Sequence, residues 1–220
     1  MNKTYMLLGI LLLGGLAFAI SGASVSSEAE QGKWDGLYTG SAPTEGGNVS
    51  GVNIEGNYST EKWAAFYGDV STGIVLADSA GINVYNWTYS AESGEVCLNT
   101  GGTFNWASAA ATTANAVDSQ FGLVGTDADS ANNTLTGSCT VTLLDVASPI
   151  TGAPSVVLKS GYETCALQDG TPSTKDDLAF CVDIGTANNY NGTAVNYEIM
   201  VPTSDNADAT ETYYFFVELV

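Results

Sequence analysis

Residues 73–89 read GIVLADSAGINVYNWTY, and this stretch decides the fold class. Its first strand is short and apolar, and the four residues after it have turn chemistry. Its second strand alternates and carries aromatic residues on one face: Tyr85, Trp87 and Tyr89. Two such strands around a four-residue connection are typical of a β-hairpin. The stretch therefore predicts antiparallel β structure.

Strand-like segments recur along the rest of the chain. They cover residues 95–98, 139–144, 155–159, 177–184, a run that ends at Val201, and 212–220. One helix is expected near 107–121, because apolar residues recur there at three- and four-residue steps: Ala107, Ala110, Ala114, Val117 and Phe121. Roughly nine or ten strands with one helix predict a single β-sandwich, jelly-roll or immunoglobulin-like, over residues 51–220.

The first 23 residues have the pattern of a secretory signal peptide. One lysine precedes an apolar run over residues 6–20, and small-x-small cleavage sites end at Ala19 and Ala23. The run is shorter than the roughly 20 residues that cross a bilayer. We therefore expect export to the cell surface or beyond, and a mature chain without a transmembrane span.

Residues 24–50 are expected to form a flexible N-terminal arm. They are rich in Ser, Gly, Glu and Asn, yet they contain three large side chains: Trp34, Leu37 and Tyr38. These three side chains are the candidate anchors of the arm on a partner.

The composition excludes whole classes of function. The chain has 24 acidic residues, five lysines, no arginine and no histidine, with a net charge of −19. Nucleic-acid binding depends on cationic contacts to phosphate, so no nucleic-acid partner is expected. Catalytic triads that use histidine are impossible. Paired carboxylates, as in glycosidases, remain open, but 24 acidic residues make chance pairs certain. We therefore expect no enzyme and no organic cofactor.

Four cysteines, an even number in an exported chain, favour two disulfides. Three pairings are possible, and the simplest joins neighbours in sequence, Cys97 with Cys139 and Cys165 with Cys181. A zinc site is the alternative, but the chain has no histidine and no Cys-x-x-Cys pair.

A calcium site is the one metal site that the sequence suggests. Asp127 and Asp129 are candidate ligands, because oxygen-bearing residues follow them closely. The segment lacks the glycine and the terminal glutamate of an EF-hand loop, so a solvated acidic loop is the competing interpretation.

Five glycosylation sequons follow the signal, which is only a mild enrichment for this composition. They begin at Asn48, Asn57, Asn86, Asn132 and Asn191. In an exported chain they predict a glycoprotein.

Several segments together resemble a group of exported archaeal surface proteins. In order, they are residues 59–71 (STEKWAAFYGDVS), 74–78 (IVLAD), 84–87 (VYNW), 129–134 (DSANNT), 177–181 (DLAFC), 197–202 (YEIMVP) and 213–219 (YYFFVEL). The resemblance implies a cell-surface or filament-type β protein without assigned catalytic activity, and it supplies no site residues.

These features lead to one main expectation of function. The chain is expected to be a structural subunit of a surface coat or of a pilus-like filament, which self-associates when the N-terminal arm inserts as a strand into a neighbour's sheet. The alternative is that the arm packs on its own domain or stays disordered. A non-catalytic carbohydrate- or surface-binding module is the alternative function, with Trp63, Trp87 and Trp106 as stacking candidates.

Overall fold

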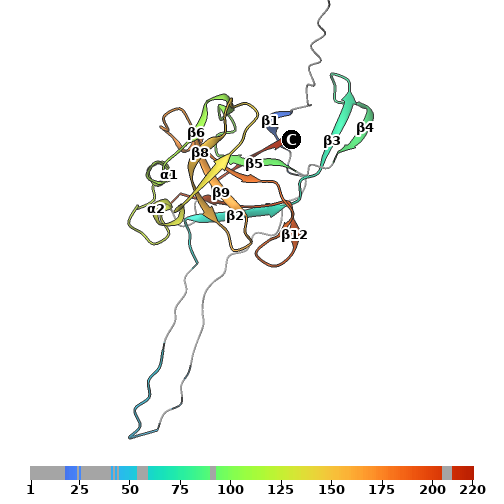
Figure 1. Ribbon diagram of the computed structural model, residues 1–220. Helices are drawn as coiled ribbons and strands as arrows, with labels where there is room; N and C mark the ends of the chain where they lie inside the picture. Colours follow the sequence, from blue (N-terminus) through green and yellow to red (C-terminus); the bar gives the residue numbers. More distant parts are fainter. Residues whose placement is uncertain are drawn as a thin grey trace, which may run out of the picture.

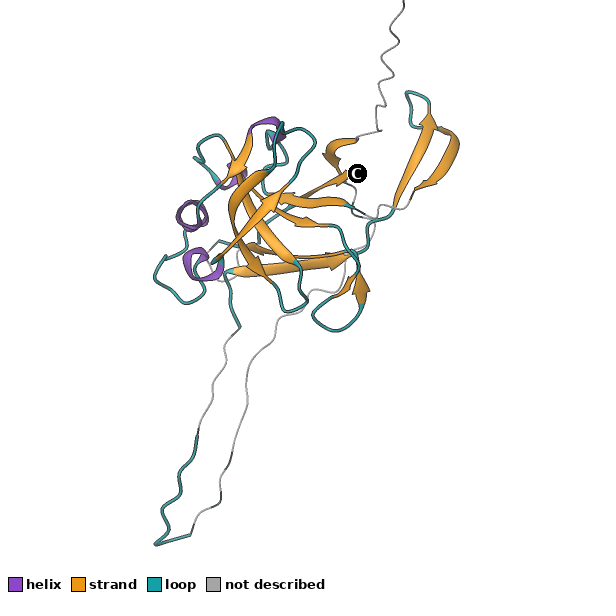
Figure 2. Ribbon diagram, in the orientation of Figure 1, coloured by secondary structure: helices purple, strands orange, loops and turns teal. Residues whose placement is uncertain are grey.

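The computed structural model describes residues 18–23, 25, 41, 43, 45–53, 59–89, 93–204 and 210–220. These residues are mainly β, as the sequence predicts (Figure 2). The strands are β1 (Phe18–Gly22), β2 (Trp63–Gly68), β3 (Thr72–Ala77), β4 (Asn83–Tyr89), β5 (Gly94–Asn99), β6 (Ala109–Ala111), β7 (Gly137–Val141), β8 (Ile150–Val157), β9 (Glu163–Asp169), β10 (Leu178–Asp183), β11 (Ala187–Asn188), β12 (Ala194–Val195), β13 (Tyr197–Pro202) and β14 (Tyr214–Leu219). The helices are α1 (Ala114–Phe121) and α2 (Ala131–Thr134), with 3₁₀ turns η1 (Trp106–Ser108) and η2 (Lys175–Asp177).

Most strands belong to one antiparallel sheet, shown at the centre of Figure 1. Its order is β1-β14-β5-β10-β9-β8-β7, and β6 also pairs with β9. Every residue of β5 is buried, and so is nearly all of β10. Both faces of these two strands are therefore covered, and a hydrophobic cluster lies on each face.

The first cluster lies between this sheet and a second layer. Val96, Leu98 and Phe180 of the sheet pack with Val117 of α1 and Ile199 of β13. Strand β13 pairs with β2, and these two strands form the second layer on this face. Two antiparallel layers around an apolar core make a sandwich-like arrangement.

The second cluster lies on the opposite face and contains all four cysteines. Phe216, Trp106 and Leu167 pack beside them. Trp106 reaches this cluster from η1, and its ring lies 5.1 Å from that of Phe216 in an edge-to-face arrangement. The disulfides are thus part of the packed core.

Helix α1 is shorter than the sequence predicts. It begins at Ala114, because Thr113 is extended and its side chain accepts a hydrogen bond from the Ala116 N–H. It ends at Phe121, because the next residue, Gly122, has a φ of 70°, in the left-handed region that glycine tolerates. The first half of the expected helix instead forms η1 and β6, because β6 pairs with β9. Strand pairing overrides the helix propensity of this alanine-rich segment.

The short helix α2 was not expected from the sequence. Its N-terminus is held by Asp118 of α1, whose carboxylate accepts from the Ala131 N–H at 2.6 Å and from the Asn132 amide at 2.7 Å. Asp118 is buried, so this link between the two helices is shielded from water.

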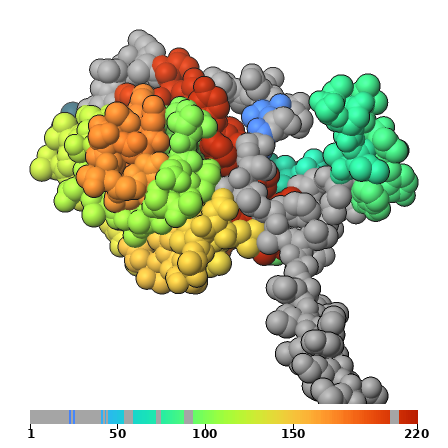
Figure 3. Space-filling model, turned by 90° about the horizontal axis from the view of Figure 1, so that it is seen from above, coloured from blue at the N-terminus to red at the C-terminus, as the bar shows by residue number. Residues whose placement is uncertain are grey.

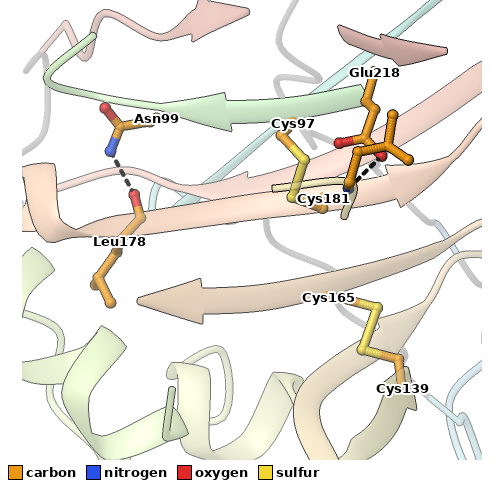
Figure 4. The surroundings of a disulfide bond; sticks show 8 residues. Cys97, Asn99, Cys139, Cys165, Leu178, Cys181 and Glu218 are labelled. Atoms are coloured by element: carbon orange, nitrogen blue, oxygen red, sulfur yellow. Dashed lines mark hydrogen bonds between the residues drawn. A yellow bond between two sulfur atoms is a disulfide. The ribbon is translucent and has the colours of Figure 1, made fainter. Parts of the chain in front are cut away.

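The cysteines pair differently from the simplest pairing. The disulfides join Cys97 to Cys181 and Cys139 to Cys165, which corrects the sequence-based preference. Cys181 lies directly opposite Cys97 on β5 and directly opposite Cys165 on β9, so sequence distance does not decide its partner. Figure 4 shows both bonds: Cys97–Cys181 joins the paired strands β5 and β10, whereas Cys139–Cys165 joins β7 to β9, with β8 between them in the sheet.

None of the helices in the part of the chain that the structure describes is long and apolar enough to span a bilayer. Residues 45–53 are exposed and lie far from the sheets, at the tip of the long extension in Figure 1. They belong in part to the expected arm.

Candidate functional site: the β14 edge and the carboxylate row behind it

The outer edge of β14 is paired with the N-terminal strand β1. Ser21 lies opposite Val217 and Gly22 opposite Phe216, and the ladder continues where the Ala23 N–H donates to the Phe215 carbonyl at 2.8 Å. The register shifts between Phe18 and Ser21, so the pairing is regular only in its second half. An N-terminal segment therefore adds to the main sheet as an antiparallel edge strand.

This edge matters because β1 lies wholly within the expected signal peptide. Successive residues of a strand direct their backbone N–H and C=O groups to opposite sides, so alternate residues face the same side. Since the Phe215 carbonyl faces β1, the N–H groups of Phe215 and Val217 face it too. Removal of residues 1–23 would leave these groups without β1.

A row of carboxylates crosses the sheet just inside this edge. Glu218 of β14 lies directly opposite Glu95 of β5, and Glu95 lies directly opposite Asp183 of β10. Directly opposed residues project from the same face of a sheet, so the three side chains are neighbours. Glu163 of β9 extends the row, since its charge acts on Asp183.

The two members of the row nearest the β14 edge, Glu218 and Glu95, are deeply buried. Glu95 is 6% exposed and Glu218 is 1% exposed, and each leaves one carboxyl oxygen, Oε2, without a hydrogen-bond partner. The other oxygen of Glu218 accepts from the Leu144 N–H at 2.9 Å, beside the Cys97–Cys181 disulfide in Figure 4. Burying an unpaired carboxylate is costly, so this site favours the neutral acid.

The pKa values follow that expectation. Burial, with the charges of Glu218 and Asp183, raises the pKa of Glu95 to about 8. Burial also raises the pKa of Glu218, and the charge of Asp145 adds to this. The pKa of Asp183 is raised by burial and by Glu163. Glu95, Glu218 and Asp183 therefore bind protons more tightly than ordinary surface carboxylates do.

A cavity of about 320 Å³ opens at the end of the row farther from β14, with Glu163 and Asp183 in its wall. Its remaining lining is mainly apolar or backbone, with Tyr162 and Thr186 as the hydroxyl groups. Within the described residues, no three acidic, cysteine or histidine side chains are gathered closely enough to hold a metal ion. The arrangement can exchange protons, and the buried Ser155 hydroxyl donates to Glu163 Oε1 at this end of the row.

The calcium candidates Asp127 and Asp129 both face a lysine. The Lys62 ammonium pairs with Asp127 and, at 3.0 Å, with Asp129 Oδ1. These hydrogen bonds raise the pKa of Lys62, and a hydrogen bond from the Thr60 hydroxyl lowers the pKa of Asp129. The Trp63 indole N–H also donates to the Asp129 carbonyl. The ammonium thus supplies the positive charge here, and the pair anchors the start of β2 to the loop before α2.

The sequons lie in different surroundings. Asn48, Asn86 and Asn191 are exposed, whereas Asn57 lies outside the described residues. Asn132 is half-buried, and its amide donates to Asp118 and Asn115. A glycan at Asn132 would break these contacts, so the three exposed sequons are the better acceptors.

The candidate stacking residues are not brought together. Trp106 is 8% exposed and packs in the second cluster, and Trp63 is partly buried against the first. Trp87 is exposed, and its ring is tilted 66° from that of Tyr85. The three arm residues, Trp34, Leu37 and Tyr38, lie outside the described residues.

Sequence reasoning missed the carboxylate row. The available signal was a glutamate within each of two otherwise apolar strand segments, at Glu95 and Glu218. Neither segment shows which strand lies beside it, so the row emerges only from the register.

Comparisons with known proteins identify no relative of this chain. Neither protein-family models, nor curated proteins, nor solved structures gave a match.

Proposed function

We propose that this chain is an exported structural subunit of a surface filament or coat, in which copies join by strand addition at β14. The observation that carries the proposal is the pairing of β1 with the outer edge of β14. After removal of residues 1–23, a neighbour's N-terminal arm takes the same position. Backbone hydrogen bonds would hold it, and Trp34, Leu37 and Tyr38 would anchor it.

Three further features support a structural role. The two disulfides suit an oxidising exterior. The composition lacks histidine and arginine. The β14 edge accepts an extended segment beyond the end of β1, since the Ala23 N–H donates to the Phe215 carbonyl. The alternative, an arm that returns to its own β14, uses the same edge without joining copies.

The first experiment is to sequence the N-terminus of the exported protein and to image it by electron microscopy. Cleavage after Ala23 predicts a chain that starts at Ser24, together with filaments or a regular coat. A chain that keeps Met1, or one that stays a monomer at every concentration, would contradict the proposal.

The second experiment blocks the edge itself. Val217→Pro removes an N–H that faces β1 while leaving the β5 side of β14 paired, so assembly should be lost. Circular dichroism and intact disulfides establish that the variant folds. Deletion of residues 24–40 should abolish assembly as well, without touching the sheet. Normal filaments from the deletion would exclude strand donation by the arm.

A further inference from the structure

The β3–β4 hairpin stands apart from the compact part of the chain. Among the described residues its two strands pair only with each other. Figures 1 and 3 show the hairpin projecting to one side of the sheets. An isolated two-stranded hairpin is at best marginally stable in water. We therefore expect a partner to contact the hairpin and stabilise it.

Both faces of the hairpin expose large apolar side chains. Leu76 lies directly opposite Tyr85, and Trp87 follows on the same face. These three side chains are 54%, 58% and 47% exposed, respectively. The other face carries Val75, 51% exposed, and Val84, 74% exposed. Exposed apolar surface concentrated on one small element marks an interaction site.

The two faces differ in one respect. Asn86, the start of an exposed sequon, lies opposite Val75 and so shares the face of Val75 and Val84. A glycan at Asn86 would cover that face. The face defined by Leu76, Tyr85 and Trp87, which we call the aromatic face, would remain open.

Charge narrows the choice of partner. The hairpin contains one charged residue, Asp78, in a chain whose net charge is −19. The Asp78 carboxylate accepts from the N–H groups of Ala80 and Ile82 within its own turn. Two copies of so acidic a chain repel one another through their like charges, and this element, with one charged residue, can meet a second copy with few like charges facing each other. A basic partner would instead prefer the acidic surface elsewhere.

We propose that the aromatic face is a docking surface for a second copy of this chain. The inference rests on the proposed function, since both require copies to meet, but it places a second contact far in sequence from the β14 edge. Strand addition supplies backbone hydrogen bonds, and the hairpin adds side-chain burial. Two separate contacts per copy would give an assembly a defined geometry.

The test compares two double variants of the mature protein. Tyr85→Ser with Trp87→Ser removes the aromatic face. Tyr190→Ser with Val157→Ser is the matched control, because these residues are 62% and 61% exposed but lie outside the hairpin. Sedimentation velocity over a concentration series should show that the hairpin variant needs at least tenfold more protein to assemble. The control should assemble as the unchanged protein does.

A photo-crosslinking amino acid at position 85 identifies the partner directly. A covalent product of twice the chain mass, with the crosslink between two copies, is the expected result. A crosslink only within one chain would overturn the inference, as would assembly of the hairpin variant at the unchanged concentration. Saccharide binding that quenches Trp87 fluorescence and excludes the crosslink would overturn it in favour of a glycan site.

The outcomes separate this inference from the proposed function. If Val217→Pro abolishes assembly and the hairpin variant assembles normally, the result supports the proposed function and excludes the aromatic face as a docking surface. If the unchanged mature protein never self-associates, both fall together.

Discussion

Two pairs of neighbouring antiparallel strands, β3–β4 and β5–β10, have similar apolar content but opposite surroundings. In β3–β4 the large side chains are about half exposed or more, where their exposure is described. In β5–β10 nearly every residue is buried, including Glu95 and Asn99. The hairpin has the clearer strand pattern, yet the central pair forms the core. Apolar alternation thus identifies a strand without revealing what covers it.

The largest expected effect on stability comes from the Cys97–Cys181 disulfide, which joins β5 to β10. Replacing Cys97 and Cys181 together by alanine should lower the free energy of unfolding by roughly 4.5 kcal/mol, from the loop-entropy cost of a separation of 84 residues. Guanidinium unfolding measures it. The matched control, Cys139→Ala with Cys165→Ala, spans 26 residues and should cost roughly 3.5 kcal/mol. A loss below about 1 kcal/mol in the Cys97→Ala, Cys181→Ala variant would show that this disulfide does not stabilise the fold by restricting the unfolded chain.

The next largest effect tests the contrast in burial directly. Phe180→Ala removes a side chain with no exposed surface and should cost about 4 kcal/mol. Trp87→Ala, measured on monomer at low concentration, should change stability by less than about 1 kcal/mol, because the ring is half exposed. Similar losses for the two variants would mean that the hairpin packs on its own domain.

The carboxylate row predicts a dependence of stability on pH. The pKa of Glu95 is about 8 in the folded chain and near 4.5 when unfolded, so the folded state keeps this proton bound at a higher pH than the unfolded state does. The stability linked to this proton is fully present below pH 4.5 and is lost as pH rises towards 8. The loss is on the order of 3 kcal/mol, after allowance for coupling to Glu218 and Asp183. Thermal melts between pH 4 and pH 9 measure this loss of stability.

Glu95→Gln is the control for that dependence. It keeps the shape of the side chain and removes the titrating group. The variant should therefore be more stable than the unchanged protein at pH 8, and its stability should depend less on pH. Lys175 and Glu211 form an ion pair elsewhere in the chain. Lys175→Met should therefore leave the slope between pH 5 and pH 8 nearly unchanged. An unaltered slope in Glu95→Gln would exclude Glu95 as its source.

The smallest expected effect lies at the start of α1. Thr113→Ala removes the cap on the Ala116 N–H and should cost about 1 kcal/mol. Thr113→Ser keeps the hydroxyl and should cost much less. Equal losses in chemical denaturation would show that the methyl group, and not the cap, holds the helix start.

Much of the fold could be predicted from local pattern. The hairpin lies where the alternation places it, and the segments near Cys97, Cys139 and Phe180 are strands as expected. The helix was predicted only in part, because pairing with β9 draws Ala109–Ala111 into the sheet. The disulfide partners were wrongly chosen, because sequence distance does not report register. The arm residues that the sequence singled out lie outside the described residues, so their role stays a prediction.

The amino-acid sequence by itself determined the β class, the acidic charge and the lack of histidine chemistry, because composition and two-residue alternation are local properties. Tertiary structure alone decided which strands are neighbours. That register joins Cys97 to Cys181, aligns Glu218, Glu95 and Asp183, and places β1 on the edge of β14. It also leaves the best strand pattern in the chain, the β3–β4 hairpin, outside the core. Burial depends on which distant segments meet, and no single segment encodes that.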